Sequence, residues 1–167
     1  MEPAVVVVPL APDGKLWLAR VNRIPTGTTS WELPGGAIDR DDEDALSAGL
    51  RELEEECGLV ASGGGRVLRN VLELAPGMGS FPHYVVVVRD VVPRVGRRPA
   101  PQADEGILAV RCFDQFQVHR LMKRRAITVL STLAALIVSG WLDLGPLERR
   151  AVRRRAGTRI VRRSRRA

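Results

Sequence analysis

Residues 51–59 read Arg51-Glu52-Leu53-Glu54-Glu55-Glu56-Cys57-Gly58-Leu59 and contain four glutamates. On a helix that turns about 100° per residue, Glu52, Glu55 and Glu56 fall within an arc of about 100°. Apolar side chains recur at steps of four, three and four residues on the other side, at Leu46, Leu50, Leu53 and Cys57. This spacing predicts an amphipathic helix that buries one face and presents three carboxylates on the other.

The ends of this helix are also marked. The pattern runs from Asp44 to Cys57, and Gly58 follows as a stop signal. The candidates for the N-cap are the aspartates just upstream, namely Asp39, Asp41 and Asp42. The sequence therefore predicts a helix over residues 44–57.

The three carboxylates point to a cation. Like charges three and four positions apart destabilise an isolated helix by a few tenths of a kcal/mol per pair, roughly, so such a face favours a compensating charge. Carboxylate oxygens with few nitrogen or sulfur ligands nearby suit Mg²⁺ or Mn²⁺ better than zinc. Three glutamates alone also fit a solvated acidic face. The pair Gly35-Gly36 favours a site, because glycine lets the backbone approach a cation or a phosphate closely.

With these glycines, the pattern resembles the box of the Nudix hydrolase family, G-x5-E-x7-R-E-U-x-E-E-x-G-U, where U is a bulky aliphatic residue. Glu43, seven further residues and the stretch 51–59 match its second part. Six residues rather than five separate Gly36 from Glu43. Counted from Gly36, Asp42 fills the first acidic position; counted from the helix, Glu43 does. We favour the helix register, because loops absorb insertions.

The resemblance implies an α/β fold, a Nudix-type α/β/α sandwich with a mixed sheet and a C-terminal helix. It also implies a hydrolase that uses Mg²⁺ or Mn²⁺ to cleave a nucleoside diphosphate linked to another group. Carried over by position, Glu52, Glu55 and Glu56 are metal ligands together with the backbone carbonyl of Gly36, and Arg51 orients a glutamate of the box. Glu52, Glu56 and Arg51 are thus the catalytic candidates within the box.

Further site candidates lie outside the box. Glu105 is the candidate for an extra acid that acts as a base or a metal ligand, although a turn at residues 104–106 explains it equally well. Arg20 and Arg23 are candidates to contact a substrate phosphate, and His83 stands at the start of a strand where it can touch substrate. Trp31 either packs on the sheet or stacks on a base.

The substrate prediction rests on resemblance to the ADP-ribose and nucleotide-sugar pyrophosphatase branch. The run Trp31-Glu32-Leu33-Pro34-Gly35-Gly36 resembles that branch, and Pro76 lies seventeen positions beyond Leu59 where the branch has a proline about sixteen beyond the box. We therefore expect ADP-ribose or a nucleotide sugar, cleaved to a nucleoside monophosphate and a sugar phosphate. The alternatives are a nucleoside triphosphate, a dinucleoside polyphosphate or a capped RNA. A non-enzymatic alternative is a nucleotide-sensing or RNA-binding module.

The net charge of +7 belongs to the C-terminal end. Residues 149–167 contain ten arginines and no acid, so residues 1–148 carry a charge of −3. This predicts a hydrolase domain over residues 1–146 and an arginine-rich, disordered tail over residues 147–167. The tail favours non-specific contact with RNA or another anionic surface.

The rest of the chain predicts a single mixed domain. Residues 4–10 and 15–21 are expected to form a β-hairpin, strands to cover residues 66–74, 84–92 and 107–113, and a long helix to lie near residues 124–139. Two cysteines in apolar patterns and the absence of a signal-peptide pattern at the start favour a cytoplasmic protein. The uncharged residues 126–142 favour a buried helix or a homodimer contact over a membrane span.

Overall fold

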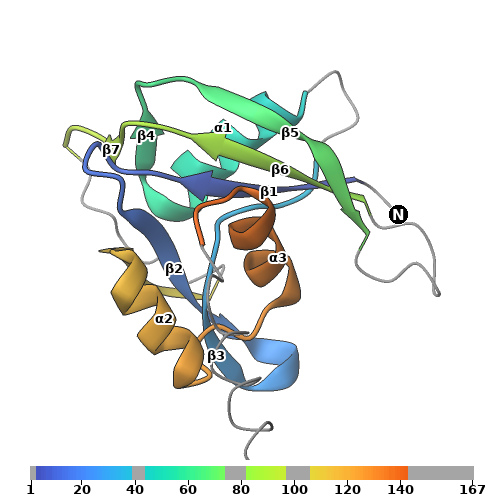
Figure 1. Cartoon of the computed structure of the whole chain (residues 1–167), viewed down its shortest axis with the longest axis vertical. Helices are drawn as coiled ribbons and strands as arrows, with labels where there is room; N and C mark the ends of the chain where they lie inside the picture. The colour runs from blue at the N-terminus through green and yellow to red at the C-terminus, as the bar shows by residue number, and fades with distance from the viewer. Residues whose placement is uncertain (1–2, 39–43, 74–81, 97–105, 143–167) are drawn as a thin grey trace, which may run out of the picture.

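The computed structural model describes residues 3–38, 44–73, 82–96 and 106–142 (Figure 1). The strands are β1 (Ala4–Pro9), β2 (Leu16–Arg23), β3 (Thr28–Glu32), β4 (Leu59–Ala61), β5 (Gly65–Glu73), β6 (Pro82–Val88), β7 (Val91–Pro93) and β8 (Ile107–Phe113). The helices are α1 (Ala45–Cys57), α2 (Gln115–Lys123) and α3 (Leu130–Val138), with a short 3-10 turn, η1, at Ile24–Thr26.

Within the described residues, the strands form three sheets. The first has the order β1-β6-β5 and is mixed, because β1 and β6 run parallel while β5 and β6 run antiparallel. The second, of order β3-β2-β8, is antiparallel, as is the small β4-β7 pair. The predicted α/β class with a mixed sheet is confirmed.

Two helices bury the two faces of the first sheet (Figure 1). Successive valines of β1 point to opposite faces, as strand geometry requires. Val5 and Val7 belong to one cluster with Leu53 of α1. Val6 and Val8 belong to the other cluster, which includes the buried Leu136 of α3. The sheet is therefore the middle layer of an α/β/α sandwich.

The predicted helix over residues 44–57 is present as α1. Asp44 is its N-cap and accepts a hydrogen bond of 2.7 Å from the Ser47 N–H, so the earlier aspartates proposed for the cap are not the ones that serve. Gly58 ends the helix in the left-handed region, at φ 64°. The predicted apolar face is wrong at one position: Leu50 is 38% exposed. The buried positions of α1 are Ala48, Gly49, Leu53 and Cys57, and this face leaves Leu50 at its margin.

The predicted hairpin of residues 4–10 and 15–21 is wrong beyond its turn. Gly14 N–H does bond to the Ala11 carbonyl over 2.8 Å, and Leu10 and Leu16 form an isolated antiparallel bridge. Beyond this bridge the strands diverge, because β1 pairs with β6 and β2 pairs with β3 and β8. The turn thus connects two sheets.

The predicted long helix near residues 124–139 is also wrong. α2 ends at Lys123, and Arg125 adopts a positive φ of 55°. The following residues pair with the edge of β3 instead of forming a helix: Trp31 N–H donates to the Ala126 carbonyl over 2.8 Å, and Thr128 N–H donates to Ser30 Oγ over 3.1 Å. α3 therefore begins only at Leu130. No helix in the described ranges is long and apolar enough to cross a bilayer.

Candidate active site

The loop at residues 34–36 runs from β3 toward α1 and is fixed against β1. Val7 N–H donates to the Pro34 carbonyl and Val5 N–H donates to the Gly36 carbonyl, each over 2.8 Å. A Cβ at Gly35 would lie 2.1 Å from the Val5 carbonyl oxygen, closer than any real contact. Only glycine allows this approach, so the first of the two glycines serves the attachment of the loop to the sheet.

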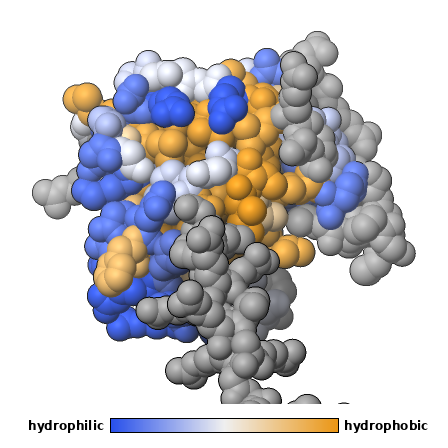
Figure 2. Space-filling model, viewed as in Figure 1, coloured by the Kyte–Doolittle hydropathy of each residue, from blue (hydrophilic) through white to orange (hydrophobic). Residues whose placement is uncertain are grey.

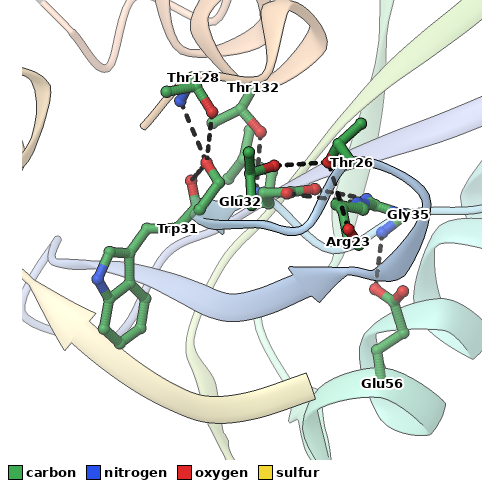
Figure 3. Close-up of polar contacts among 11 residues, drawn as sticks. Arg23, Thr26, Trp31, Glu32, Gly35, Glu56, Thr128 and Thr132 are labelled. Atoms are coloured by element: carbon green, nitrogen blue, oxygen red, sulfur yellow. Dashed lines mark hydrogen bonds and ion pairs between the residues drawn. The ribbon is translucent and has the colours of Figure 1, made fainter. Parts of the chain in front are cut away.

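The same loop lies against the acidic face of α1 (Figure 3). Gly35 N–H donates to Glu56 Oε2 over 3.0 Å. A Cβ at Gly36 would lie 2.3 Å from Glu52 Oε1. The glycine pair and two of the three box carboxylates, which the sequence places more than a dozen residues apart, therefore meet at one place.

Arg51 connects this helix face with the loop. Its Nη1 donates to Glu52 Oε1 over 2.8 Å and to Glu55 Oε2 over 3.0 Å, and its Nη2 donates to the Ala37 carbonyl over 3.1 Å. One guanidinium thus holds two carboxylates and the loop backbone in a defined arrangement.

A second ion pair, between Arg23 of β2 and Glu32 of β3, adjoins the helix face (Figure 3). Arg23 Nη2 lies 2.5 Å from Glu32 Oε2, and Glu32 is only 2% exposed. The hydrogen bond to Glu32, followed by the nearby charges of Glu32 and Glu56, raises the pKa of Arg23 above its ordinary value. Arg23 is one of the residues expected from the sequence to bind a phosphate, whereas Glu32 was not predicted as a site residue. The alternation of side chains along residues 28–32 was the available signal for it.

The two strand arginines proposed to meet substrate lie on opposite faces of the second sheet. Directly opposed residues of antiparallel strands share a face, and Arg20 is opposite Trp31 while Ala19 is opposite Glu32. Arg23 shares the face of Glu32, toward α1. Arg20 shares the other face with Trp31, away from the box.

Trp31 packs rather than facing the box. Its ring meets that of Phe113 edge to face, at 4.8 Å between centroids and 77° between planes. Figure 3 shows the indole directed away from Glu56. His83 lies in β6, between its neighbours Ala4 of β1 and Leu72 of β5.

A model of the NUDIX domain matches residues 1–132. This chain belongs to the NUDIX family. The crystal structure of an ADP compounds hydrolase superposes with a TM-score of 0.67 at 27% identity, covering 83% of this chain and 71% of the other. Nudix hydrolase 14 of Arabidopsis thaliana, described as chloroplastic, is 42% identical over 60 residues, which are 34% of this chain and 19% of that protein.

An RNA pyrophosphohydrolase of Caulobacter vibrioides is 41% identical over 60 residues, which are 36% of this chain and 34% of that protein. The chain thus spans between a fifth and a third of the length of these two curated relatives. The similarity to these two relatives is confined to a segment of 60 residues. The Nudix family model covers far more of the chain, and the described fold continues beyond it to Leu142, which is buried.

The Nudix family generally uses a divalent metal, and the donors present fit one by their chemistry. Glu52, Glu55 and Glu56 supply hard carboxylate oxygens, and the Gly36 carbonyl keeps one lone pair beyond its bond to Val5. In the described part of the chain no three acidic, histidine or cysteine side chains already converge on one point. Arg51 bridges two of the carboxylates instead.

Several candidates lie outside the described residues. These are Asp42 and Glu43, the two alternatives for the first acidic position of the Nudix box, together with Glu105, Pro76 and the tail at residues 147–167. Their assignments, and the domain boundary at residue 146, stay predictions.

Proposed function

We propose that this Nudix protein hydrolyses the pyrophosphate bond of ADP-ribose or a nucleotide sugar. Water forms a bond to one phosphorus atom while the bond from that phosphorus to the bridging oxygen breaks. The other phosphate leaves with the bridging oxygen, so ADP-ribose yields AMP and ribose 5-phosphate. The observation that carries the proposal is the contact between the Gly35-Gly36 loop and the carboxylates of Glu52 and Glu56. It brings the backbone of the two glycines together with two carboxylates of the box, in a family that generally uses a divalent metal.

In this proposal the box residues hold the metal. Glu52, Glu55, Glu56 and the Gly36 carbonyl are its ligands, and Arg51 positions the first two carboxylates. Bound there, Mg²⁺ or Mn²⁺ supplies charge neutralisation for the pyrophosphate and lowers the pKa of a bound water.

Arg23 is the proposed contact for a substrate phosphate. Its Nε and Nη2 are directed to the buried Glu32, which fixes the guanidinium near Glu56. Nη1 makes no hydrogen bond within the described residues and remains available. A guanidinium anchored on one side by a carboxylate and open on the other suits recognition of a phosphate.

The preference for an ADP compound rests on the fold comparison, since the ADP compounds hydrolase structure aligns with most of this chain. A second candidate has its own support. The local match to an RNA pyrophosphohydrolase favours removal of pyrophosphate from a 5′-triphosphate RNA end. The two activities differ in their products.

Product analysis by mass spectrometry separates them. The full chain is incubated with Mg²⁺, or with Mn²⁺, and with ADP-ribose, a nucleotide sugar, a dinucleoside polyphosphate, a nucleoside triphosphate or a 5′-triphosphate RNA. We expect AMP and ribose 5-phosphate from ADP-ribose. Pyrophosphate released only from the 5′-triphosphate RNA overturns the substrate proposal in favour of the second candidate. Pyrophosphate released only from the nucleoside triphosphate overturns both. A folded protein that binds metal but turns over nothing overturns both in favour of a sensing module.

A further inference from the structure

α2 and the neighbouring strand β8 carry a basic surface remote from the box. Arg120, Lys123 and Arg124 are exposed on α2 and its C-cap, and Arg111 is exposed on β8. No acidic residue occurs between Asp114 and Asp143. Within the described residues, none of these four cations forms an ion pair. Figure 2 shows mostly hydrophilic residues over α2, at the lower left of the view.

A pocket and an exposed aromatic ring lie among these charged residues. The pocket has a volume of about 160 Å³ and lies between β8 and α2, lined by Phe113, Gln117, Arg120, Leu121 and Arg124. Phe116, one turn before Arg120, is 70% exposed, and the Arg120 guanidinium stands 6.0 Å from the centre of its ring. The pocket thus combines an apolar wall, Phe113 and Leu121, with the guanidinium groups of Arg120 and Arg124, and the exposed Phe116 ring lies beside it. This combination suits a ligand in which flat bases alternate with phosphates.

The second sheet extends this surface. Arg111 is opposite Leu18, and Ala109 is opposite Arg20. Arg20 and Arg111 are therefore diagonal neighbours on one face of the sheet, a relationship in which the two Cα atoms typically lie about 7–8 Å apart. Phe113 lies two residues beyond Arg111 and shares its face. This is the face of Trp31, opposite the one that carries Glu32 toward the box.

From these observations we infer that the surface formed by Arg20, Arg111, Phe116, Arg120, Lys123 and Arg124 binds single-stranded RNA. The guanidinium and ammonium groups neutralise backbone phosphates, and Phe116 stacks on a base. Charge alone would equally attract an anionic membrane. The exposed Phe116 ring and the pocket, which has both apolar and guanidinium lining, favour a single strand whose bases can stack. Because this surface and the box lie on opposite faces of the second sheet, the inference does not depend on which pyrophosphate the box cleaves.

The test measures binding of a fluorescent decauridylate with a 5′-hydroxyl to the full chain by anisotropy. Without a pyrophosphate and in the presence of EDTA, this probe is no substrate for the box. The double variant Arg120→Gln/Arg124→Gln is compared with a control of equal charge change, Arg66→Gln/Arg89→Gln. The control arginines are also exposed and, within the described residues, also without an ion pair.

Affinity falls as salt rises, and we expect the α2 double variant to make this dependence shallower. The slope of log affinity against log salt should become less negative by about 1.4, at about 0.7 for each lost phosphate contact on a single strand. The control leaves the slope unchanged. Equal losses in both variants overturn the inference, because the attraction then comes from overall charge, the arginine-rich end included. Thermal melts of all variants check that these surface changes leave the fold intact.

Phe116→Ala tests the stacking. It should weaken decauridylate binding about 5- to 150-fold, which corresponds to ~1–3 kcal/mol for one stacked base. Binding of a ten-unit inorganic polyphosphate should stay unchanged. An unchanged affinity for RNA, or preferential binding to vesicles of phosphatidylglycerol, overturns the inference. Photo-cross-linking of a decauridylate that contains 4-thiouridine locates the bound RNA. Adducts in the tryptic peptide 112–120 support the inference, and adducts confined to residues 147–167 overturn it.

Discussion

The backbone N–H of Gly35 donates a hydrogen bond of 3.0 Å to Oε2 of Glu56, a residue 21 positions further along the chain. This bond joins the loop after β3 to the acidic face of α1. It also orients one Glu56 oxygen toward the loop, next to Gly36, where any Cβ would collide with the Glu52 carboxylate. The loop and the helix therefore act as one unit, and substitutions on either side should affect the same activity.

Glu56→Gln should abolish most of the hydrolysis while leaving the fold intact. The amide keeps the shape of the carboxylate but removes the charge that holds a divalent cation. We expect kcat/KM to fall by more than about 100-fold, beyond the 10- to 100-fold that outer partners of a metal contribute. Glu54→Gln is the matched control, because Glu54 lies on the same helix and pairs with Arg94 outside the box cluster. Equal activity of the two variants would contradict the ligand assignment.

Alanine substitutions at the two glycines of the loop should have different effects, with Gly35→Ala lowering the stability of the fold and Gly36→Ala lowering the apparent affinity for the metal. Gly35→Ala forces a Cβ against the Val5 carbonyl of β1, which has no room to move, so unfolding free energy should drop by about 1–3 kcal/mol. In Gly36→Ala the three atoms nearest the new Cβ all belong to the end of the Glu52 side chain, which can shift by rotating. The melting temperature of this variant should stay near that of the parent, while the metal concentration needed for half activity rises. Denaturant melts and metal titrations of both variants check this, and the reverse pattern would refute it.

Thr132 should stabilise the start of the loop from α3. It is buried, and its Oγ1 accepts a hydrogen bond of 3.0 Å from the Leu33 N–H. Thr132→Val keeps the volume and leaves this buried donor unsatisfied, at a cost of about 1–3 kcal/mol. Thr132→Ser keeps the acceptor and should lose less. Urea unfolding of the pair measures the difference, and a serine variant no more stable than the valine variant would show that packing, not the bond, matters.

The N-cap of α1 should make part of the stability depend on acid pH. The hydrogen bond from the Ser47 N–H holds the pKa of Asp44 below its ordinary value of 3.8. A carboxyl with a lowered pKa stabilises the folded state at any pH above the unfolded value, and the contribution disappears as pH falls through the folded value. Asp44→Ala should therefore melt lower than the parent at pH 7, and this gap should close below about pH 4. Melting curves at several pH values test it; a gap that is constant with pH would rule out the cap charge.

Local sequence determined the elements that carry the chemistry. Helical spacing was enough to place α1 between Asp44 and Gly58 and to put Glu52, Glu55 and Glu56 on one side, because these features depend on neighbours three and four residues away. Strand β8 also follows from its own residues, 107–113. The family resemblance was readable for the same reason, since most of the box lies within one helix.

The contacts between segments distant in the sequence follow only from the tertiary structure. The partners of β1 and β2 lie in different sheets, Leu50 stays partly exposed, and Arg125 interrupts the expected long helix so that residues 126–128 can pair with β3. The pairing of Arg23 with the buried Glu32 belongs here too, as does the division of Arg20 and Arg23 between opposite faces. Each of these depends on segments far apart in the chain whose register is set by burying a common core, and local periodicity carries no information about such pairings.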